Sequence, residues 1–218
     1  MNQPLLIIGN RNYSSWSLRA WSAMRKSGVS FDVRRLPLDT PEFRDEIPDL
    51  SPTHRVPALW HRANCIWDSL AICEYANEQF AQGELLPRDV GDRAWARSVS
   101  AEMHAGFAAV RNAMPMNLRA RGRRVATDAA VQADLNRAFS IWTQCRTAHA
   151  SKGPWLFGDF SIADAMYIPL VLRLPTYGVT MPVVVSEYLA TVESDDDIAQ
   201  WVREGLEETE IVEADEAG

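Results

Sequence analysis

A loop rich in hydroxyl groups follows the first apolar segment of the chain. Ser14, Ser15 and Ser17 take three of four positions there. The apolar run Leu5–Ile8 predicts a buried strand before the loop, and apolar residues at helical spacing predict a helix over residues 17–26. Ligands of open α/β sheets bind beyond the carboxyl ends of strands, and a helix N-terminus favours an anion such as a thiolate. Serines also cap helices without binding a ligand, so both roles stay open.

Two further segments could bind an extended ligand with charged ends. Pro57 opens an apolar segment, and a cis bond before it would turn the backbone of Val56 toward such a ligand. Asp68 and Ser69 begin another helical pattern, where N–H groups and a hydroxyl could bind a carboxylate while Asp68 held an ammonium. Proline at a strand start and an ordinary helix cap are the plainer interpretations.

The elements that must position these residues follow the order β-α-β-α-β-β-α. The patterns predict strands over residues 5–8, 31–36, 57–60 and 65–67, with helices over 17–26, from 41 toward 49, and after 69. The second strand alternates apolar and basic residues, which is typical of an exposed edge.

Composition changes in the second part of the chain. From residue 92 the strand signal nearly vanishes, and alanine, arginine, leucine and methionine dominate. We therefore expect an α/β domain over residues 1–82, a linker over 83–91 and an all-helical domain over 92–218. Ser161 and Asp164 have the spacing of a capping box, whose role is in folding.

Charge and composition exclude several classes of function. The formal net charge is -7, which argues against nucleic acid as a partner. Hydrophobic residues make up 47% and charged residues 23%, as in packed globular proteins. No leader-like start or long apolar run is present, so we expect no membrane partner and a cytoplasmic location. Cys65, Cys73 and Cys145 lack C-x-x-C spacing and are expected to be reduced structural thiols.

Two segments concentrate charge of one sign. The basic cluster consists of Arg119, Arg121, Arg123 and Arg124. The acidic tail contains Glu207, Glu208, Glu210, Glu213, Asp215 and Glu216. We expect a solvated loop and a frayed terminus, respectively.

Taken together, these motifs resemble the glutathione transferases of the cytosolic type. The marks are the serine loop, similar to that of zeta- and theta-like members, the Val56-Pro57 pair, the segment from Asp68 to Ile72, and the Ser161 to Asp164 box. The resemblance spans nearly the whole chain. It implies a thioredoxin-like glutathione-binding domain, an all-helical substrate-binding domain, a homodimer and a role in detoxification.

The resemblance also assigns roles to single residues. Ser14 would hydrogen-bond the glutathione sulfur, with Ser15 and Ser17 as alternatives. Val56 would pair with the cysteinyl part through its backbone, and Pro57 would be cis. Asp68 with Ser69 would hold the γ-glutamyl end, while His54 or Arg55 would meet the glycyl carboxylate. The complete expected glutathione set is Tyr13, His54, Arg55, Val56, Pro57, Asp68 and Ser69.

The second substrate would bind mainly against the helical domain. A single long helix predicted over residues 94–114 places several side chains on one face at spacings of one, three and four. The expected electrophile pocket contains Trp16, Met103, His104, Phe107 and Arg111. A helical histidine is more often structural, and Arg111 could instead pair with a nearby carboxylate.

The resemblance implies conjugation of the glutathione thiolate to a small hydrophobic electrophile, with glutathione as co-substrate and no metal. One alternative is glutathione-dependent cis-trans isomerisation of a maleylacetoacetate-like diacid, whose carboxylates Arg111 and the basic cluster could bind. Trp16 stands where zeta-like members have cysteine, which puts that isomerase activity in doubt. Another alternative is a non-catalytic transferase-like binding module.

Overall fold

A four-stranded mixed sheet carries the N-terminal part of the protein. The computed structural model describes residues 3–218. The strands are β1 (Leu5–Ile8), β2 (Asp32–Arg35), β3 (Ala58–His61) and β4 (Asn64–Trp67). Their order is β2-β1-β3-β4, with β1 parallel to β2 and antiparallel to β3, and β3 antiparallel to β4. The predicted edge position of the second strand is confirmed, because β2 is an edge strand and mostly exposed.

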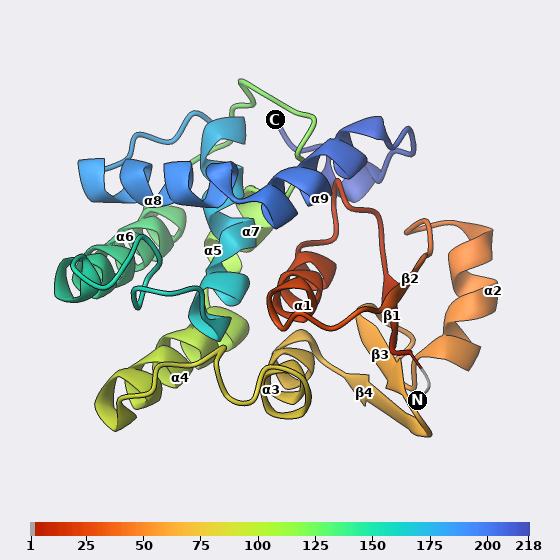
Figure 1. Cartoon of the computed structure of the whole chain (residues 1–218). Coiled ribbons are helices and arrows are strands. Elements are labelled where there is room, and N and C mark those ends of the chain that lie inside the picture. Colours follow the sequence, from red (N-terminus) through yellow and green to blue (C-terminus); the bar gives the residue numbers. More distant parts are fainter. Residues whose placement is uncertain (1–2) are drawn as a thin grey trace.

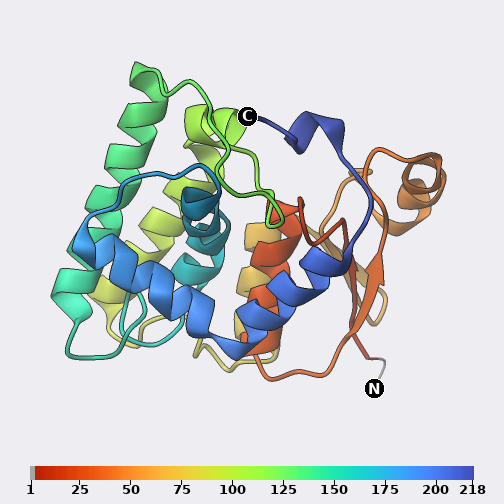
Figure 2. The ribbon, with the colours of Figure 1, turned by 90° about the horizontal axis from the view of Figure 1, so that it is seen from above.

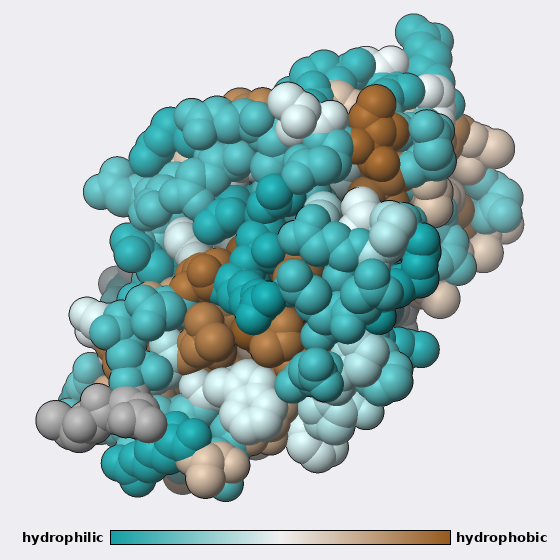
Figure 3. All heavy atoms as spheres, turned by 90° about the vertical axis from the view of Figure 1, so that its right-hand side faces the viewer, coloured by the Kyte–Doolittle hydropathy of each residue, from teal (hydrophilic) through white to brown (hydrophobic). Residues whose placement is uncertain are grey.

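Helices cover both faces of this sheet (Figure 1). They are α1 (Ser15–Lys26), α2 (Pro41–Leu50) and α3 (Ser69–Gln79). Leu6 and Ile8 of β1 join the main core with α1 and α3, whereas Ile7 packs into a smaller cluster with Ile47 of α2. The predicted burial of the first strand on both faces is therefore confirmed, as is the thioredoxin-like β-α-β-α-β-β-α order. Figure 3 shows the side of α2, where hydrophilic residues cover most of the surface between small apolar areas.

The rest of the chain is helical, as predicted (Figure 2). Its helices are α4 (Val90–Ala105), α5 (Ala108–Ala113), α6 (Ala129–His149), α7 (Ile162–Thr176), α8 (Val183–Ser194) and α9 (Asp196–Glu207), followed by the 3-10 helix η1 (Glu213–Asp215). The largely buried α7 packs against both α1 and α4, so one core runs through both parts of the chain. The division into two domains with a linker over residues 83–91 stays a prediction. Between residues 3 and 218, no helix has both the length and the apolarity that crossing a membrane requires.

The long helix predicted over residues 94–114 is interrupted. α4 ends at Ala105, where the amide of Gly106 closes the last turn on the Glu102 carbonyl at 2.8 Å. Phe107 then takes a left-handed conformation with φ of 59° before α5 begins. A Cβ at Gly106 would lie 2.8 Å from the Glu102 carbonyl oxygen, so this helix end requires glycine. The prediction of one continuous face was therefore wrong.

The capping box at the start of α7 is confirmed. Ser161 and Asp164 make both reciprocal hydrogen bonds of the motif. Asp164 is fully buried and also accepts from the Leu156 backbone at 3.0 Å and from the Tyr188 hydroxyl at 3.0 Å. One carboxylate thus joins three separate segments of the helical part.

The cysteines are free thiols, as expected. Burial raises the pKa of Cys73 and that of Cys145 to about 12, so neither is a thiolate at neutral pH.

Candidate active site

A cavity of about 380 Å³ opens between the serine loop, the segment before β3, α5 and the acidic tail. Its lining combines hydroxyls, guanidinium groups and apolar side chains. The lining residues are Tyr13, Ser14, Ser15, Trp16, Leu38, Phe43, His54, Arg55, Val56, Arg111, Asn112, Pro115, Met116, Arg173 and Asp215. The structure therefore brings eight of the predicted site residues to one hollow.

Ser14 is the N-cap of α1. Its Oγ accepts from the backbone N–H of Ser17 at 3.3 Å and donates to Ser17 Oγ at 2.7 Å. The capping role weighed from the sequence is confirmed, and the same hydroxyl also lines the cavity at the positive end of the helix. Ser15 lines the cavity as well, whereas Ser17 is fully buried behind Ser14 and accepts from the Gly9 amide at 3.1 Å.

The segment before β3 forms the opposite wall. The Val56–Pro57 bond is cis, as expected. Val56 lines the cavity together with His54 and Arg55, whose side chains are exposed, while Pro57 is buried beneath them.

Asp68 and Ser69 lie outside the cavity lining, at the start of α3. Asp68 caps the helix through Leu70 N at 2.9 Å and lies 3.3 Å from His104 Nε2. His104 in turn makes an edge contact with the Trp16 ring at 5.4 Å. Ser69 Oγ is buried and has no hydrogen-bond partner among residues 3–218. His104 therefore links the two parts of the candidate site instead of lining the cavity.

Two members of the expected electrophile pocket belong to the core. Met103 is fully buried on α4, and Phe107 packs edge-on against Tyr167 at 6.0 Å. The break at Gly106 separates Met103 from Arg111, which does line the cavity and lies over the Trp16 ring at 4.7 Å. The shared face expected for these residues does not exist, because it assumed an uninterrupted helix.

Sequence reasoning missed seven lining residues: Leu38, Phe43, Asn112, Pro115, Met116, Arg173 and Asp215. Only one carried a local signal. Arg173 interrupts the otherwise apolar run of α7, and a charge inside such a run indicates a special role. Asp215 belongs to the acidic tail, whose charge pattern predicted only a frayed terminus, and the remaining five come from segments with no distinguishing pattern.

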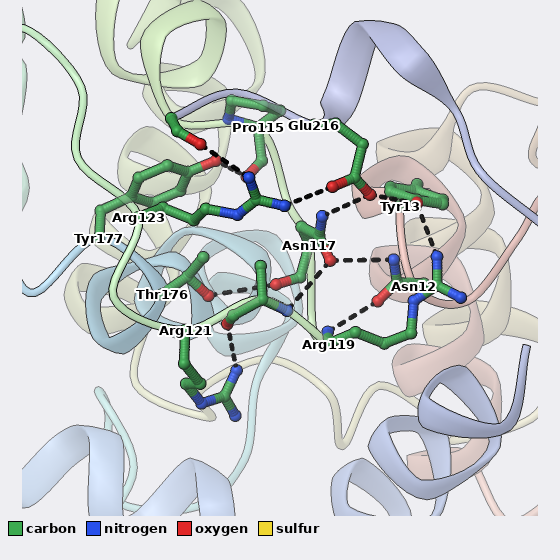
Figure 4. A network of polar contacts seen from close by, with 12 residues as sticks. Asn12, Tyr13, Pro115, Asn117, Arg119, Arg121, Arg123, Thr176, Tyr177 and Glu216 are labelled. Carbon is green, nitrogen blue, oxygen red and sulfur yellow. Dashed lines mark hydrogen bonds and ion pairs between the residues drawn. The ribbon is translucent and has the colours of Figure 1, made fainter. Parts of the chain in front are cut away.

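The acidic tail and the basic cluster meet beside the serine loop, so the expectation of a frayed terminus and a solvated loop was wrong (Figure 4). Arg119 donates to the Tyr13 hydroxyl at 2.7 Å and to backbone carbonyls of the tail, Glu210 among them. Glu216 accepts from the Tyr13 hydroxyl at 2.6 Å and pairs with Arg123. Arg121 and Arg124 remain exposed, as predicted. The arginines of the basic cluster and the glutamates of the acidic tail thus pair with groups that are absent from their own segments.

Glu208 holds the serine loop directly. Its carboxylate accepts from the backbone N–H groups of Arg11 at 2.9 Å and Asn12 at 3.2 Å. Helix α9 approaches equally closely, since a Cβ at Gly205 would lie 3.2 Å from Asn12 N. The loop that carries Ser14 is thus anchored by the end of the chain.

We expect Glu208→Ala to lower the free energy of unfolding by about 1–3 kcal/mol, because two amides lose their acceptor. Hydrogen exchange at the Arg11 and Asn12 amides, measured by NMR or mass spectrometry, should accelerate. Glu207→Ala is the matched control, since Glu207 is an exposed neighbour. Unchanged exchange at the loop amides of the Glu208 variant would contradict this anchoring role.

Comparison with known proteins identifies the N-terminal part. Residues 13–79 match the family described as the glutathione S-transferase N-terminal domain. A probable maleylacetoacetate isomerase from Caenorhabditis elegans is 28% identical over 116 residues, 53% of each chain. Maleylacetoacetate isomerase from Rattus norvegicus is 31% identical over 113 residues, 50% of this chain and 51% of that protein. The match thus spans about half the length of these curated relatives.

Solved structures share the fold over nearly the whole chain. A glutathione transferase homolog from Burkholderia GL BGR1, with bound glutathione, has a TM-score of 0.70 and 23% identity, covering 94% of this chain and 98% of that one. The theta class enzyme from Xanthomonas axonopodis pv. citri, also with glutathione bound, has a TM-score of 0.66 and 22% identity, covering 93% and 98%. Residues 13–79 therefore form a glutathione S-transferase N-terminal domain, and nearly the whole chain shares the fold of these two solved glutathione transferases.

Proposed function

We propose that this protein is a glutathione transferase that joins the glutathione thiolate to a small electrophile. The observation that carries the proposal is that Ser14, the N-cap of α1, lines the same cavity as Val56, the residue before cis-Pro57. The family membership of residues 13–79 supports the choice of glutathione.

The chemistry required of Ser14 is stabilisation of an anion. A free thiol has a pKa near 8.5, so only a few per cent is ionised at neutral pH. Lowering that pKa by about two units takes roughly 2.7 kcal/mol of preference for the thiolate. One hydroxyl donor together with a helix N-terminus is of that size.

Ser17 would orient the proton of Ser14. Ser14 donates to Ser17 Oγ at 2.7 Å in the free protein, and a hydroxyl can rotate so that Ser17 becomes the donor when an anion occupies the cavity. When Ser17 donates, Ser14 accepts from both the Ser17 hydroxyl and the Ser17 amide, and its own proton is free for sulfur. Ser17 is thus a positioning residue rather than the group that touches sulfur.

Ser17→Ala is expected to raise the pKa of the bound thiol and to lower kcat/KM about tenfold, because Ser14 loses the partner that orients its proton. The pKa is measured by titrating the ultraviolet absorbance of the bound thiolate. Ser22→Ala is the control, since Ser22 is equally buried on α1 but donates only to backbone carbonyls of its own helix. Equal thiol pKa values in the two variants would rule out this orienting role.

The remaining parts of glutathione have candidate partners. We place the cysteinyl backbone on Val56 beside cis-Pro57, and the glycyl carboxylate near His54 or Arg55. The γ-glutamyl end would reach Asp68 and Ser69, where the unpartnered Ser69 hydroxyl supports the assignment. Tyr13 would act through its ring, because Glu216 and Arg119 already bind its hydroxyl.

Two measurements test the function. Calorimetry should detect binding of reduced glutathione, and the complex should displace chloride from 1-chloro-2,4-dinitrobenzene faster than glutathione alone. No glutathione uptake would overturn the proposal. Uptake without turnover of a panel of electrophiles would favour the non-catalytic binding module.

An isomerase acting on a maleylacetoacetate-like diacid is the second candidate. The names of several curated relatives favour it, and Arg111 lines the cavity. Glutathione-dependent cis-trans isomerisation without net glutathione consumption would identify this activity. A homodimer, a cytoplasmic location and a detoxifying role stay predictions.

A further inference from the structure

Three guanidinium groups gather beside the cavity, of which Arg111 and Arg173 line it while Arg19 is buried outside its lining. Arg19 and Arg111 lie over the Trp16 ring, with Cζ atoms 4.3 and 4.7 Å from its centroid. Arg173 comes from the central helix α7 and lines the same cavity. Arg19 and Arg173 are 1% and 4% exposed.

No carboxylate within residues 3–218 forms an ion pair with any of the three. Arg173 donates to the Pro169 carbonyl and Arg111 to that of Gly106, both close in sequence. Nε of Arg173 and two nitrogens of Arg19 have no hydrogen-bond partner among the described residues. Two cations are therefore buried without an ion-pair partner among the described residues.

The energetic consequence is unfavourable in the free protein. Burial, together with repulsion from the neighbouring guanidinium groups, lowers the pKa of Arg19 to about 9 and that of Arg173 to about 10. Both side chains still carry a charge at neutral pH. An uncompensated buried cation costs several kcal/mol, and stacking on Trp16 offsets only part of that cost.

The other residues that line the cavity indicate which kind of ligand would pair with these guanidinium groups. Asp215 is the only acidic residue among the lining residues, which include Arg55, Arg111 and Arg173, and its charge acts on Arg173. Burial raises the pKa of Asp215 to about 6. The lining also contains five apolar side chains, which are Trp16, Leu38, Phe43, Pro115 and Met116. A cavity with excess positive charge and apolar walls fits a ligand with an anionic head and an apolar body.

We propose that the electrophilic substrate carries a carboxylate, which Arg173 and Arg111 bind while its apolar body lies against Trp16 and Met116. The inference rests on the proposed transferase function and specifies its substrate class. For an enone acid, the thiolate sulfur bonds to the β-carbon and the π pair moves to the carbonyl oxygen. The resulting enolate then takes a proton from water.

A matched pair of electrophiles tests the proposal on the wild-type protein. The probes are 4-(3-oxobut-1-enyl)benzoate and its methyl ester, each rate being divided by its uncatalysed rate with glutathione. We expect kcat/KM to favour the carboxylate about tenfold or more, as for a charge-assisted hydrogen bond. Equal values, or a preference for the ester, would overturn the inference while leaving the transferase function intact.

Substitutions test which residue binds the carboxylate of the substrate. Arg173→Met should remove most of the preference for the carboxylate and leave the KM for glutathione unchanged, whereas Asp215→Asn should increase the preference. Arg88→Met is the control, because Arg88 is exposed on a distant surface and outside the cavity. If Arg173→Met raises the KM for glutathione and leaves the preference for the carboxylate over the ester unchanged, Arg173 binds glutathione and the inference is wrong.

Binding measurements separate the site from the reaction. The unreactive acid 4-(3-oxobutyl)benzoate should bind more tightly than its methyl ester in calorimetry, and Arg173→Met should abolish the difference. Arg173→Met should melt at or above the wild-type temperature, because methionine removes an unpaired buried charge. Arg173-dependent binding without turnover would contradict the transferase function but support the anion site. Absence of both binding and turnover would overturn the two together.

Discussion

Ser14→Ala is expected to lower kcat/KM for glutathione conjugation about 100-fold at neutral pH, because a positioned donor to a developing or resident anion contributes 10²–10³ in rate. The pKa of bound glutathione should rise by about one to two units, since a hydrogen bond to a charged group is worth about 1.5–3 kcal/mol. A pH profile of kcat/KM and the ultraviolet titration of the bound thiolate measure these effects. At sufficiently high pH the variant should approach wild-type turnover.

The second function of Ser14 as a helix cap needs its own control. Ser14→Gly also lacks the hydroxyl but costs only a few tenths of a kcal/mol in capping, whereas alanine costs about 1 kcal/mol. Equal losses of activity with unequal losses of stability would assign the activity to the hydroxyl. A full loss in Ser15→Ala with an active Ser14→Ala would transfer the role to Ser15, which lines the same cavity.

Asp164→Ala is expected to lower the free energy of unfolding by about 3–5 kcal/mol, because each buried donor left without an acceptor costs about 1–3 kcal/mol. Its carboxylate accepts hydrogen bonds from Leu156, from both donors of Ser161, and from the Tyr188 hydroxyl. Alanine would leave these buried donors without an acceptor. Urea denaturation followed by tryptophan fluorescence measures the loss. Asp159→Ala, at an exposed neighbouring position, should cost less than about 0.5 kcal/mol.

The raised pKa of Asp164 predicts how the stability of the protein changes with pH. Burial raises its pKa to about 6, above the value in the unfolded chain. The folded state therefore binds the proton more tightly, and the contribution of this group to stability is full below the unfolded pKa and is lost as pH rises through 6. Wild type should accordingly gain stability relative to Asp164→Asn as pH falls from 7 to 4. A constant difference over that interval would contradict the raised pKa.

Local patterns were sufficient to predict most of the elements. The apolar run of β1, the cap at Ser14 and the box at Ser161 each depend on residues within a few positions, so sequence spacing determines them. The prediction over residues 94–114 failed where one local signal, Gly106, was overlooked among strong helix formers.

The sequence by itself determined the thioredoxin-like order, the helical second part and the hydroxyl loop at the start of α1, because strand and helix signals act over short distances. Only the tertiary structure decided that Arg119 and Glu216 flank Tyr13, and that Arg173 meets Arg111 in the cavity. These partners come from segments that are far apart in the sequence. The surroundings of each charged side chain therefore depend on tertiary packing, which no local pattern encodes. The same packing buries two guanidinium groups without an ion pair among the described residues, which is the physical basis for expecting an anionic substrate.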